Sequence, residues 1–255
     1  MSLSLFQLDG RIAIVTGASR GLGAAASEAL ASAGSDVVLI GRNKATLQER
    51  SGTLATSYGV QTFPLVCDMS DPERIIEAVR VVVERFGRID ILVNNAGIVR
   101  RAPARDYTLD DWNDVLAVNL TGPFLMAREV GRAMLDQHSG KIINVASLLS
   151  FSGGLNVVAY TASKHAVAGM TRSLANEWGE HGVQVNAIAP GYFHTEATSA
   201  IQQNSERYES LRSRIPAGRW GEPDDLKGTV IFLASRASDY INGHVLAVDG
   251  GWLVR

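Results

Sequence analysis

One serine, one tyrosine and one lysine near the middle of the chain have the types and spacing that acid–base chemistry needs. Tyr160 and Lys164 lie four residues apart, and in a helix such residues project from the same face. A phenol titrates near pH ~10, but a nearby cation favours its anion, so Lys164 would make Tyr160 usable as an acid or base near neutrality. Ser147 would hold a substrate oxygen. Taken alone, a Tyr–Lys pair of this spacing is usually part of an exposed amphipathic face, so the rest of the chain must decide.

The composition favours one α/β domain and excludes several kinds of partner. With 255 residues, 46% of them hydrophobic, the chain can bury one full core. The formal charge of -2 argues against nucleic acid or an anionic membrane as the main partner. The single cysteine, Cys67, excludes an internal disulfide, and the five scattered histidines have no metal-ligand spacing, so no metal site is expected. Residues 1–10 lack an export signal and no apolar run is long enough to cross a membrane, so we expect a cytoplasmic protein.

A glycine-rich turn between a predicted strand and a predicted helix indicates a dinucleotide site. Residues 11–16 form a short apolar run, and residues 24–33 follow as a helix of small residues. The glycines between them are spaced G-x-x-x-G-x-G rather than G-x-G-x-x-G. Backbone N–H groups and the positive end of the helix would hold a pyrophosphate there. The residues expected to bind the cofactor in this turn are Gly17, Ser19, Arg20, Gly21, Leu22 and Gly23.

Arg42, which follows a predicted strand over residues 36–40, bears on the choice of cofactor. At this position of a Rossmann fold a carboxylate would accept from a free 2′-hydroxyl of the ribose, whereas an arginine would pair with a 2′-phosphate. The chain has Arg42 and no carboxylate there, and Arg20 would add a second cation. NADP(H) is therefore favoured. NAD(H) stays open as the alternative, because the other interpretation of each arginine is a solvated surface charge.

The remainder of the chain alternates strands with helices, which predicts one doubly wound α/β domain over residues 1–255. We expect a seven-stranded parallel sheet of the Rossmann type, with right-handed crossovers, helices on both faces and ligands at the carboxyl ends of the strands. Residues 192–218 are polar and weakly patterned, which suits a mobile lid over the substrate. The five further apolar runs that complete the sheet are 61–67, 89–93, 140–146, 183–189 and 245–248.

Polar residues that follow two of these strands would face a bound ligand. Asp68, beside Met69, would accept from the adenine amino group, with a loop or cap role as the alternative. Arg100 and Arg101 are adjacent on a loop, where arginines are usually exposed charges. A guanidinium is nevertheless well suited to a carboxylate, so an anionic substrate is the second interpretation of this pair.

Asn119 falls inside a predicted long helix over residues 108–135, whose start at Thr108 resembles a capping box with Asp in place of Glu. An asparagine within a helix is ordinarily a solvent-facing residue without a role. A kink near Pro123 would instead expose a backbone carbonyl able to bind water. The two interpretations are both open on the sequence.

These residues, in this order and spacing, resemble the classical short-chain dehydrogenase/reductase family over nearly the whole chain. The resemblance implies that Tyr160 is the general acid/base and that Lys164 lowers its pKa and holds the nicotinamide ribose. It also implies that Ser147 positions the reacting oxygen and that Asn119 helps to hold a water in a proton relay. The motifs are Thr16-Gly17-x-x-x-Gly21-x-Gly23, Asn94-Asn95-Ala96-Gly97, Asn119, Ser147, Tyr160-x-x-x-Lys164 and Pro190-Gly191.

The same resemblance extends the expected cofactor site. Asn95 and Gly97 would line the adenosine side, and Thr195 would meet the nicotinamide carboxamide. Outside the glycine turn, the full set expected at the cofactor is Arg42, Asp68, Met69, Asn95, Ala96, Gly97, Tyr160, Lys164, Pro190, Gly191 and Thr195.

Three stretches, residues 141–151, 215–221 and 247–253, resemble a narrower group. This group contains the 2-deoxy-D-gluconate 3-dehydrogenases, also called 2-dehydro-3-deoxy-D-gluconate 5-dehydrogenases, and the related gluconate 5-dehydrogenases. It implies hydride transfer between a nicotinamide cofactor and a secondary alcohol or ketone of a sugar acid, whose carboxylate would meet Arg100 or Arg101. Several members are NAD-dependent and differ at residues 41–43, so the group and Arg42 point to different cofactors.

Two alternatives to this function are kept. Within enzymes, the chain would be a 3-oxoacyl carrier-protein reductase or another small-alcohol dehydrogenase. Outside enzymes, it would be a non-catalytic dinucleotide-sensing regulator, although such a protein is expected to have lost one of Ser147, Tyr160 and Lys164. The apolar, glycine-rich residues 242–255 suit burial against a partner subunit, and the resemblance implies a homotetramer.

Overall fold

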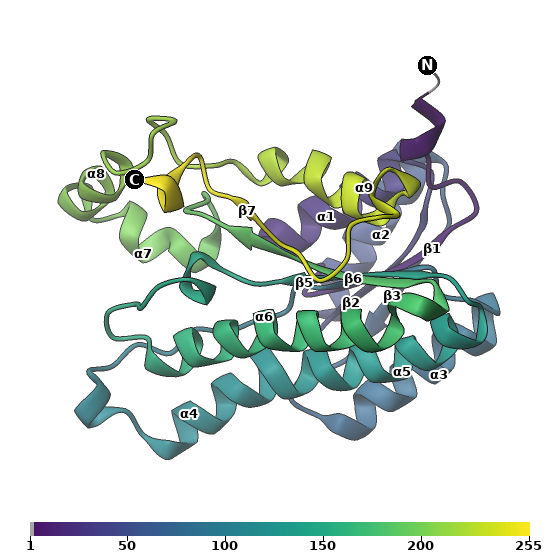
Figure 1. The fold of residues 1–255 in the computed structure, drawn as a ribbon, viewed down its shortest axis with the longest axis horizontal. Coiled ribbons are helices and arrows are strands. Elements are labelled where there is room, and N and C mark those ends of the chain that lie inside the picture. The colour runs from purple at the N-terminus through teal and green to yellow at the C-terminus, as the bar shows by residue number, and fades with distance from the viewer. Residues whose placement is uncertain (1–2) are drawn as a thin grey trace.

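A seven-stranded sheet runs through the molecule in the order β3-β2-β1-β4-β5-β6-β7, and every pair of neighbours is parallel (Figure 1). This computed structural model describes residues 3–255, so the first two residues of the predicted domain lie outside the described part. The doubly wound parallel sheet predicted from the sequence is confirmed. Its strands are β1 Ile12–Thr16, β2 Asp36–Gly41, β3 Thr62–Val66, β4 Ile91–Asn94, β5 Gly140–Val145, β6 Val183–Pro190 and β7 Val245–Val248.

Helices cover both faces of this sheet (Figure 1). On one face lie α1 Gly21–Ser32, α2 Lys44–Tyr58 and α9 Lys227–Ala234. On the other lie α3 Pro72–Phe86, α5 Gly122–Asp136 and α6 Val158–Trp178. In the part of the chain that the structure describes, none of the helices combines the length and the apolar composition needed to cross a bilayer.

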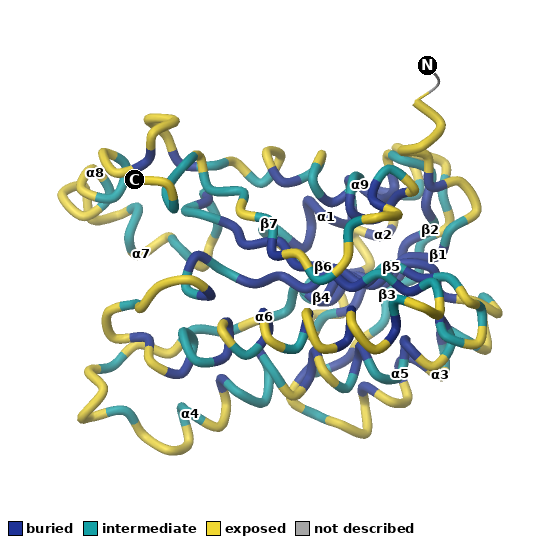
Figure 2. Tube along the Cα trace, viewed as in Figure 1, coloured by how far each residue is buried: buried dark blue, intermediate teal, exposed yellow. Residues whose placement is uncertain are grey.

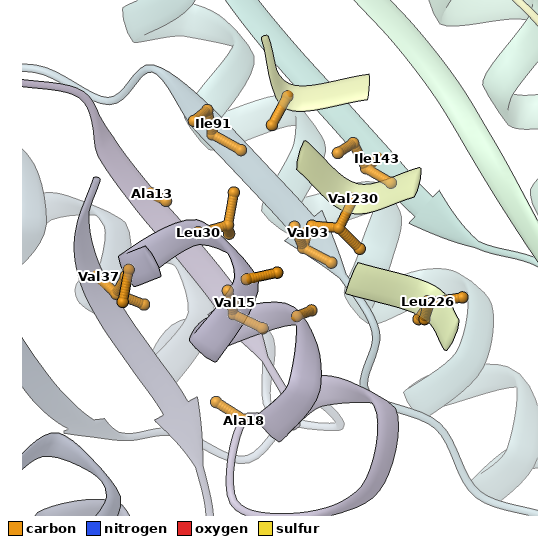
Figure 3. Packing of buried hydrophobic residues seen from close by; sticks show 14 of the residues in the cluster. Ala13, Val15, Ala18, Leu30, Val37, Ile91, Val93, Ile143, Leu226 and Val230 are labelled. Atoms are coloured by element: carbon orange, nitrogen blue, oxygen red, sulfur yellow. The ribbon is translucent and has the colours of Figure 1, made fainter. Parts of the chain in front are cut away.

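The alternation of side chains along each strand divides the core into two layers. Ala13 and Val15 of β1 pack beneath α1 and α9 (Figure 3). Ile12 and Ile14 of the same strand pack against the helices of the opposite face. Figure 2 shows the strands as the most deeply buried part of the tube. Burying each valine or isoleucine side chain contributes roughly 1.5–3 kcal/mol, so the sheet is a stable platform for the loops at its edge.

Helix α9 was not predicted from the sequence. It begins with Lys, Gly and Thr, and its last five residues, 230–234, are all apolar, an arrangement that gives no amphipathic signal. The helix is stabilised by burial of its apolar side chains against the sheet face beside α1. Val230 and Leu233 are at most 1% exposed there. Tertiary burial therefore decides the structure of this segment.

The predicted long helix over residues 108–135 is wrong in one respect, because the structure divides it. Helix α4, Leu109–Leu116, passes through a π-helical turn, Ala117–Thr121, before α5 begins. Thr108 caps α4 by accepting from the Asp111 N–H at 3.1 Å, as its position predicts. The π turn adds one residue to the helical repeat, and such turns are frequent at functional sites.

Residues 192–218 contain two short helices, α7 Ser199–Gln202 and α8 Ser205–Arg212, in place of an unpatterned loop. Asn204 caps α8 by accepting from the Arg207 N–H at 3.0 Å. In Figure 1, α7, α8 and the C-terminal residues lie on one side of the strand ends, and α4 and the start of α6 lie on the other. That the segment moves as a lid stays a prediction.

Candidate active site

The ends of β1 and β4 are joined by a set of hydrogen bonds that build the base of the site. Thr16 Oγ1 accepts from the N–H groups of Asn95 at 3.0 Å and Ala96 at 3.1 Å. Asn95 Nδ2 donates in return to the carbonyls of Thr16 at 3.0 Å and Gly17 at 3.3 Å. The Asn95 side chain therefore holds the glycine turn beside the loop after β4, which is a structural role alongside its predicted place at the cofactor.

The glycine turn is too tight for any side chain at Gly23. A Cβ there would lie 2.1 Å from the Gly17 carbonyl oxygen and 2.4 Å from Asn95 Nδ2. Gly17 itself has a φ of +65, the left-handed region that favours glycine. The backbone can therefore come close to a ligand over Gly17–Gly23.

The start of α1 is open to an anion. Its N-cap residue, Arg20, makes no side-chain capping bond, whereas Asn43 and Asp71 cap α2 and α3 with their side chains. First-turn N–H groups without a capping side chain are ready to bind a phosphate, which the positive end of the helix also favours. The residues present thus fit the pyrophosphate of a dinucleotide cofactor.

Lys164 is fixed to the end of β5. Its Nζ donates to the Val145 carbonyl at 2.6 Å, and the residue is 4% exposed. The same nitrogen lies 5.6 Å from the centre of the Tyr160 ring. Burial lowers the pKa of Lys164 to about 8. The lysine is therefore a positioned cation with donors to spare, since an ammonium has three and Val145 uses one.

Tyr160 lies in the first turn of α6, next to Ser147 after β5. Burial raises the pKa of its hydroxyl above the ordinary value, and the interaction with the Ser147 hydroxyl and the field of Arg101 lower it. Ser147 also accepts from the Leu149 N–H at 3.1 Å, which fixes its side chain at the strand end. The structure thus brings Ser147, Tyr160 and Lys164 together, and Arg101 acts on Tyr160 electrostatically. The effect of Lys164 on the pKa of Tyr160 stays a prediction.

Asn119 is 1% exposed, so the solvent-facing interpretation of this residue is wrong. The π turn directs its side chain to Ile98, where Oδ1 accepts from the backbone N–H at 2.8 Å and Nδ2 donates to the carbonyl at 2.9 Å. Nδ2 also lies 3.3 Å from Ser163 Oγ on α6. Asn119 therefore links the loop after β4 to α6, and its part in a proton relay stays a prediction.

The two adjacent arginines have different surroundings. Arg100 Nε lies 3.4 Å from Asp111 Oδ1 and its Nη2 3.6 Å from Asp114 Oδ2, so α4 holds this guanidinium. Arg101 forms no ion pair within residues 3–255, and its field acts on the hydroxyls of Tyr160 and Tyr192. Of the pair, Arg101 is the cation whose field acts on Tyr160.

At the adenosine side, Arg42 and Asp68 face each other at 4.0 Å, both well exposed. Asp68 Oδ1 accepts from the Ser70 N–H at 2.9 Å and hydroxyl at 2.8 Å, and these bonds lower the pKa of the carboxyl, with the backbone bond the stronger effect. The loop role of Asp68 is thus present in the structure. Met69 is buried, and its carbonyl oxygen would lie 2.3 Å from a Cβ at Gly122, so it packs against the start of α5.

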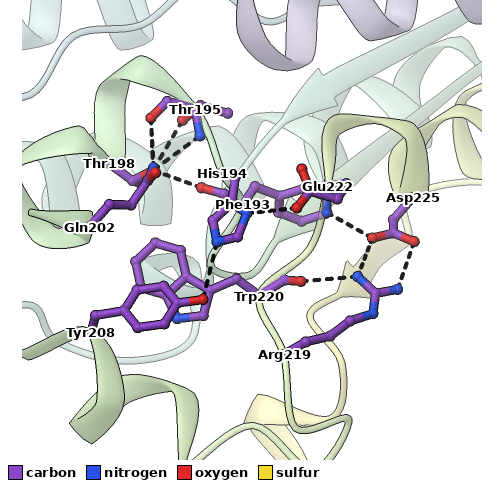
Figure 4. A network of polar contacts seen from close by, with 10 residues as sticks. All are labelled: Phe193, His194, Thr195, Thr198, Gln202, Tyr208, Arg219, Trp220, Glu222 and Asp225. Atoms are coloured by element: carbon purple, nitrogen blue, oxygen red, sulfur yellow. Dashed lines mark hydrogen bonds and ion pairs between the residues drawn. The ribbon is translucent and has the colours of Figure 1, made fainter. Parts of the chain in front are cut away.

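Arg20 and Thr195 connect the glycine turn to the segment after β6. Arg20 forms an exposed ion pair with Glu196. A Cβ at Gly21 would lie 3.5 Å from the Thr195 methyl group, so these residues are neighbours. Thr195 and Thr198 cap the short turn Glu196–Thr198, as Figure 4 shows. The segment after Pro190-Gly191 thus lies beside the glycine turn, where Thr195 is expected to meet the cofactor.

An aromatic cluster near this segment was missed in the sequence. Its residues are spread over some sixty positions of the chain, so no local sequence pattern predicts that they meet. The centre of the Trp220 ring lies 4.8 Å from that of Tyr208 and 5.6 Å from that of His194 (Figure 4). His194 Nδ1 is also 2.6 Å from Glu222. We call this set the aromatic cluster: Tyr192, His194, Tyr208, Trp220 and Trp252.

A cavity of about 400 Å³ lies at the opposite edge of the sheet and is not the candidate site. Four of its charged lining groups are paired, Arg11 with Asp90 and Lys141 with Asp239, both at 2.8 Å. Its strand residues belong to the amino ends of β4, β5 and β6, whereas ligands of such sheets bind at the carboxyl ends.

Comparison with known proteins identifies the family. A family model described as enoyl-(acyl carrier protein) reductase, of the short-chain dehydrogenase type, matches residues 17–253. The chain belongs to the short-chain dehydrogenase/reductase family. As a member it is an NAD(P)-dependent oxidoreductase that acts on CH-OH groups, which confirms the enzyme class predicted from the sequence.

Relatives within the short-chain dehydrogenase/reductase family include enzymes named for sugar acids. The chain is 51% identical to the 2-dehydro-3-deoxy-D-gluconate 5-dehydrogenase of Bacillus subtilis, over 98% of this chain and 97% of that one. It is 42% identical to the gluconate 5-dehydrogenase of Gluconobacter oxydans, over 97% and 96%. The structure of a gluconate 5-dehydrogenase from Burkholderia cenocepacia, in complex with NADP and tartrate, matches with a TM-score of 0.94 at 41% identity and 100% coverage of both chains. The narrower resemblance is thereby confirmed.

Proposed function

We propose that this enzyme interconverts a secondary alcohol and a ketone of a sugar acid, with NADP(H) as the hydride carrier. Its substrates would be of the 2-dehydro-3-deoxy-D-gluconate, 2-deoxy-D-gluconate or gluconate type. The observation that carries this proposal is Arg101, a guanidinium that forms no ion pair with any carboxylate of residues 3–255 and whose field acts on the Tyr160 hydroxyl. An anionic substrate supplies the missing partner.

The residues divide the chemistry among them. In the oxidation direction Tyr160, as phenolate, takes the proton of the substrate hydroxyl, and Ser147 orients the same oxygen. Lys164, held by Val145, keeps two donors for the nicotinamide ribose. The cofactor, when bound, supplies the hydride acceptor. The low exposure of Lys164 keeps its charge effective beside the reacting oxygen.

The choice of NADP(H) rests on Arg42. Its separation of 4.0 Å from Asp68 is a weak, solvent-exposed pairing, which a 2′-phosphate can replace with a stronger charge-assisted contact. The relative from Burkholderia cenocepacia is complexed with NADP, which supports the same choice. NAD(H) is the alternative that the kinetic comparison below decides.

Assembly and location are further parts of the proposal. Strand β7 is an edge strand of the sheet and Trp252 and Leu253 follow it near the chain end, so a partner subunit would cover apolar surface there. We propose a homotetramer, which light scattering coupled to size exclusion tests, and a monomeric mass contradicts it. The cytoplasmic location expected from the single cysteine is likewise a proposal.

The test is a kinetic panel with NADP and NAD on 2-dehydro-3-deoxy-D-gluconate, D-gluconate and 2-deoxy-D-gluconate. A 3-oxoacyl thioester and a neutral secondary alcohol complete it. We expect kcat/KM for at least one sugar acid to exceed that of both other substrates by a factor on the order of 10². A preference for the thioester would favour the carrier-protein reductase instead. Cofactor binding without turnover of any substrate would favour the dinucleotide-sensing regulator.

A further inference from the structure

Three arginines act electrostatically on Tyr192, the second residue after β6. They come from three places in the chain, since Arg101 follows β4, Arg207 lies in α8 and Arg214 follows α8. The field of each lowers the pKa of the Tyr192 hydroxyl, although burial raises it by more. Their guanidinium groups are therefore within electrostatic reach of one hydroxyl group.

These three arginines form no ion pair with any residue from 3 to 255, in contrast to their neighbours. Arg212 binds Glu209 at 2.6 Å, and Arg219 binds Asp225 at 2.6 Å, in the same region of the chain. Three like charges gathered without a counter-charge repel one another. A bound anion would relieve that repulsion, so the arrangement favours a negatively charged ligand.

Arg214 is held in place by the aromatic cluster. Its Cζ lies 4.1 Å from the centre of the Trp252 ring, and Trp252 in turn packs edge-on against Tyr192 at 4.9 Å. Tyr192 also contacts Trp220 at 5.2 Å, and Trp220 is 1% exposed. A guanidinium stacked on an aromatic face is already oriented, so it loses little freedom when it binds a carboxylate.

Arg207 is positioned by the same cluster through α8. The adjacent residue, Tyr208, packs on Trp220 at 4.8 Å, and its hydroxyl is 3.3 Å from His194 Nε2 (Figure 4). Helix α8 is thereby attached to the residues that follow β6. Helix α8, which contains Arg207, lies on the opposite side of the strand ends from α4, and the loop of Arg101 leads to α4 (Figure 1).

Arg101 connects this group to the reacting centre, because its field acts on both Tyr160 and Tyr192. We propose that Arg101, Arg207 and Arg214, together with the Tyr192 hydroxyl, bind the carboxylate of the substrate from two sides and select sugar acids over neutral polyols. This inference rests on the proposed function and names the residues that would recognise the acid group. Arg101, Arg207 and Arg214 are exposed and so accessible to a ligand. Each charge-assisted contact to a carboxylate changes affinity by about 10- to 100-fold.

The test measures binding of tartrate, a hydroxy dicarboxylate, to the NADP-loaded enzyme by calorimetry. Arg207→Met and Arg214→Met keep an apolar side chain in place of the charge, and Arg212→Met, whose charge is already paired with Glu209, is the matched control. We expect the dissociation constant to rise about 10- to 100-fold in the first two variants and less than about twofold in the control. Arg214→Lys, which keeps the charge but loses the planar fork, should fall between wild type and Arg214→Met.

Kinetics with the best sugar acid of the panel give the second readout, in which KM should rise in Arg207→Met and Arg214→Met with kcat nearly unchanged. Tartrate affinity equal to wild type in both variants, with sugar acids still turned over, would overturn this inference and leave the proposed function standing. Equal losses in Arg212→Met would overturn it as well, since the effect would then be general electrostatics. If the wild-type enzyme turns over no sugar acid, the proposed function itself fails.

Discussion

The Asn119 carboxamide binds both backbone groups of Ile98, accepting from its N–H at 2.8 Å and donating to its carbonyl at 2.9 Å. This pair of bonds is the connection between the π turn and the loop that carries Arg101. It gives Asn119 a positioning role that is independent of any water it helps to hold.

We expect Asn119→Ala to lower the free energy of unfolding by about 1–3 kcal/mol, because the part-buried N–H and C=O of Ile98 lose their partners. The KM for the sugar acid should rise as well, since the Arg101 loop is released. Urea unfolding and steady-state kinetics measure the two effects. Asn113→Ala, at an exposed position of α4, is the control and should change stability by less than about 0.5 kcal/mol. Equal effects in both variants would remove the positioning role.

The pH profile of oxidation tests the groups that act on Tyr160. Arg101 and Ser147 both lower the pKa of its hydroxyl, so Arg101→Met and Ser147→Ala should raise that pKa. Oxidation needs the phenolate, and the rising limb of log kcat/KM should therefore move to higher pH in both variants. Arg100→Met should leave the limb in place, because α4 already pairs this guanidinium. If the rising limb moved in Arg100→Met and not in Arg101→Met, Arg100 would be the arginine that acts on Tyr160.

Arg42→Asp tests the cofactor choice. The variant replaces the cation expected at the 2′-phosphate by an anion, so the ratio of kcat/KM for NADP to that for NAD should fall at least about 10- to 100-fold. Arg50→Asp changes the same charge at an exposed position of α2 and serves as control. An unchanged ratio in Arg42→Asp would leave the NAD(H) alternative as the better account.

The buried charge of Lys164 should lower the free energy of unfolding of the enzyme. Its pKa of about 8 is lower than the ordinary value of 10.5, so the unfolded chain binds more protons between these pH values and stability rises with pH across that window. Below pH 8 the cost is fully present, about 3 kcal/mol. In Lys164→Met the stability advantage over wild type should shrink by about that amount between pH 8 and 10.5. Lys44→Met, at an exposed position, is the control. If urea unfolding shows no pH-dependent difference between Lys164→Met and wild type, the lowered pKa of Lys164 is contradicted.

Much of the fold was predictable because each strand is an apolar run whose last residue can be recognised in the sequence. Buried parallel strands are continuous apolar runs, and the residues that follow them, Gly17, Asn95 and Ser147, therefore had to meet at one edge of the sheet. The i, i+4 spacing of Tyr160 and Lys164 likewise needs only a helix, and α6 supplies it.

The remainder depends on contacts that local patterns do not contain. One extra residue in the π turn buries Asn119, and a periodicity of 3.6 does not reveal it. Which of Arg100 and Arg101 is free depends on Asp111 and Asp114, which only the packing of α4 brings near. The sequences of helix α9 and of the aromatic cluster have no helical or strand periodicity. Both form because tertiary contacts bury their side chains.

The most direct measurement compares Tyr160→Phe with Tyr240→Phe, a fully exposed control, in NADP(H) titration and in turnover of the preferred sugar acid. The Phe side chain keeps the ring but has no proton to exchange, so we expect unchanged cofactor affinity and a loss of kcat on the order of 10² or more, the scale of general acid–base catalysis. Tyr240→Phe should match wild type in both. Turnover in Tyr160→Phe equal to that of wild type would contradict the account.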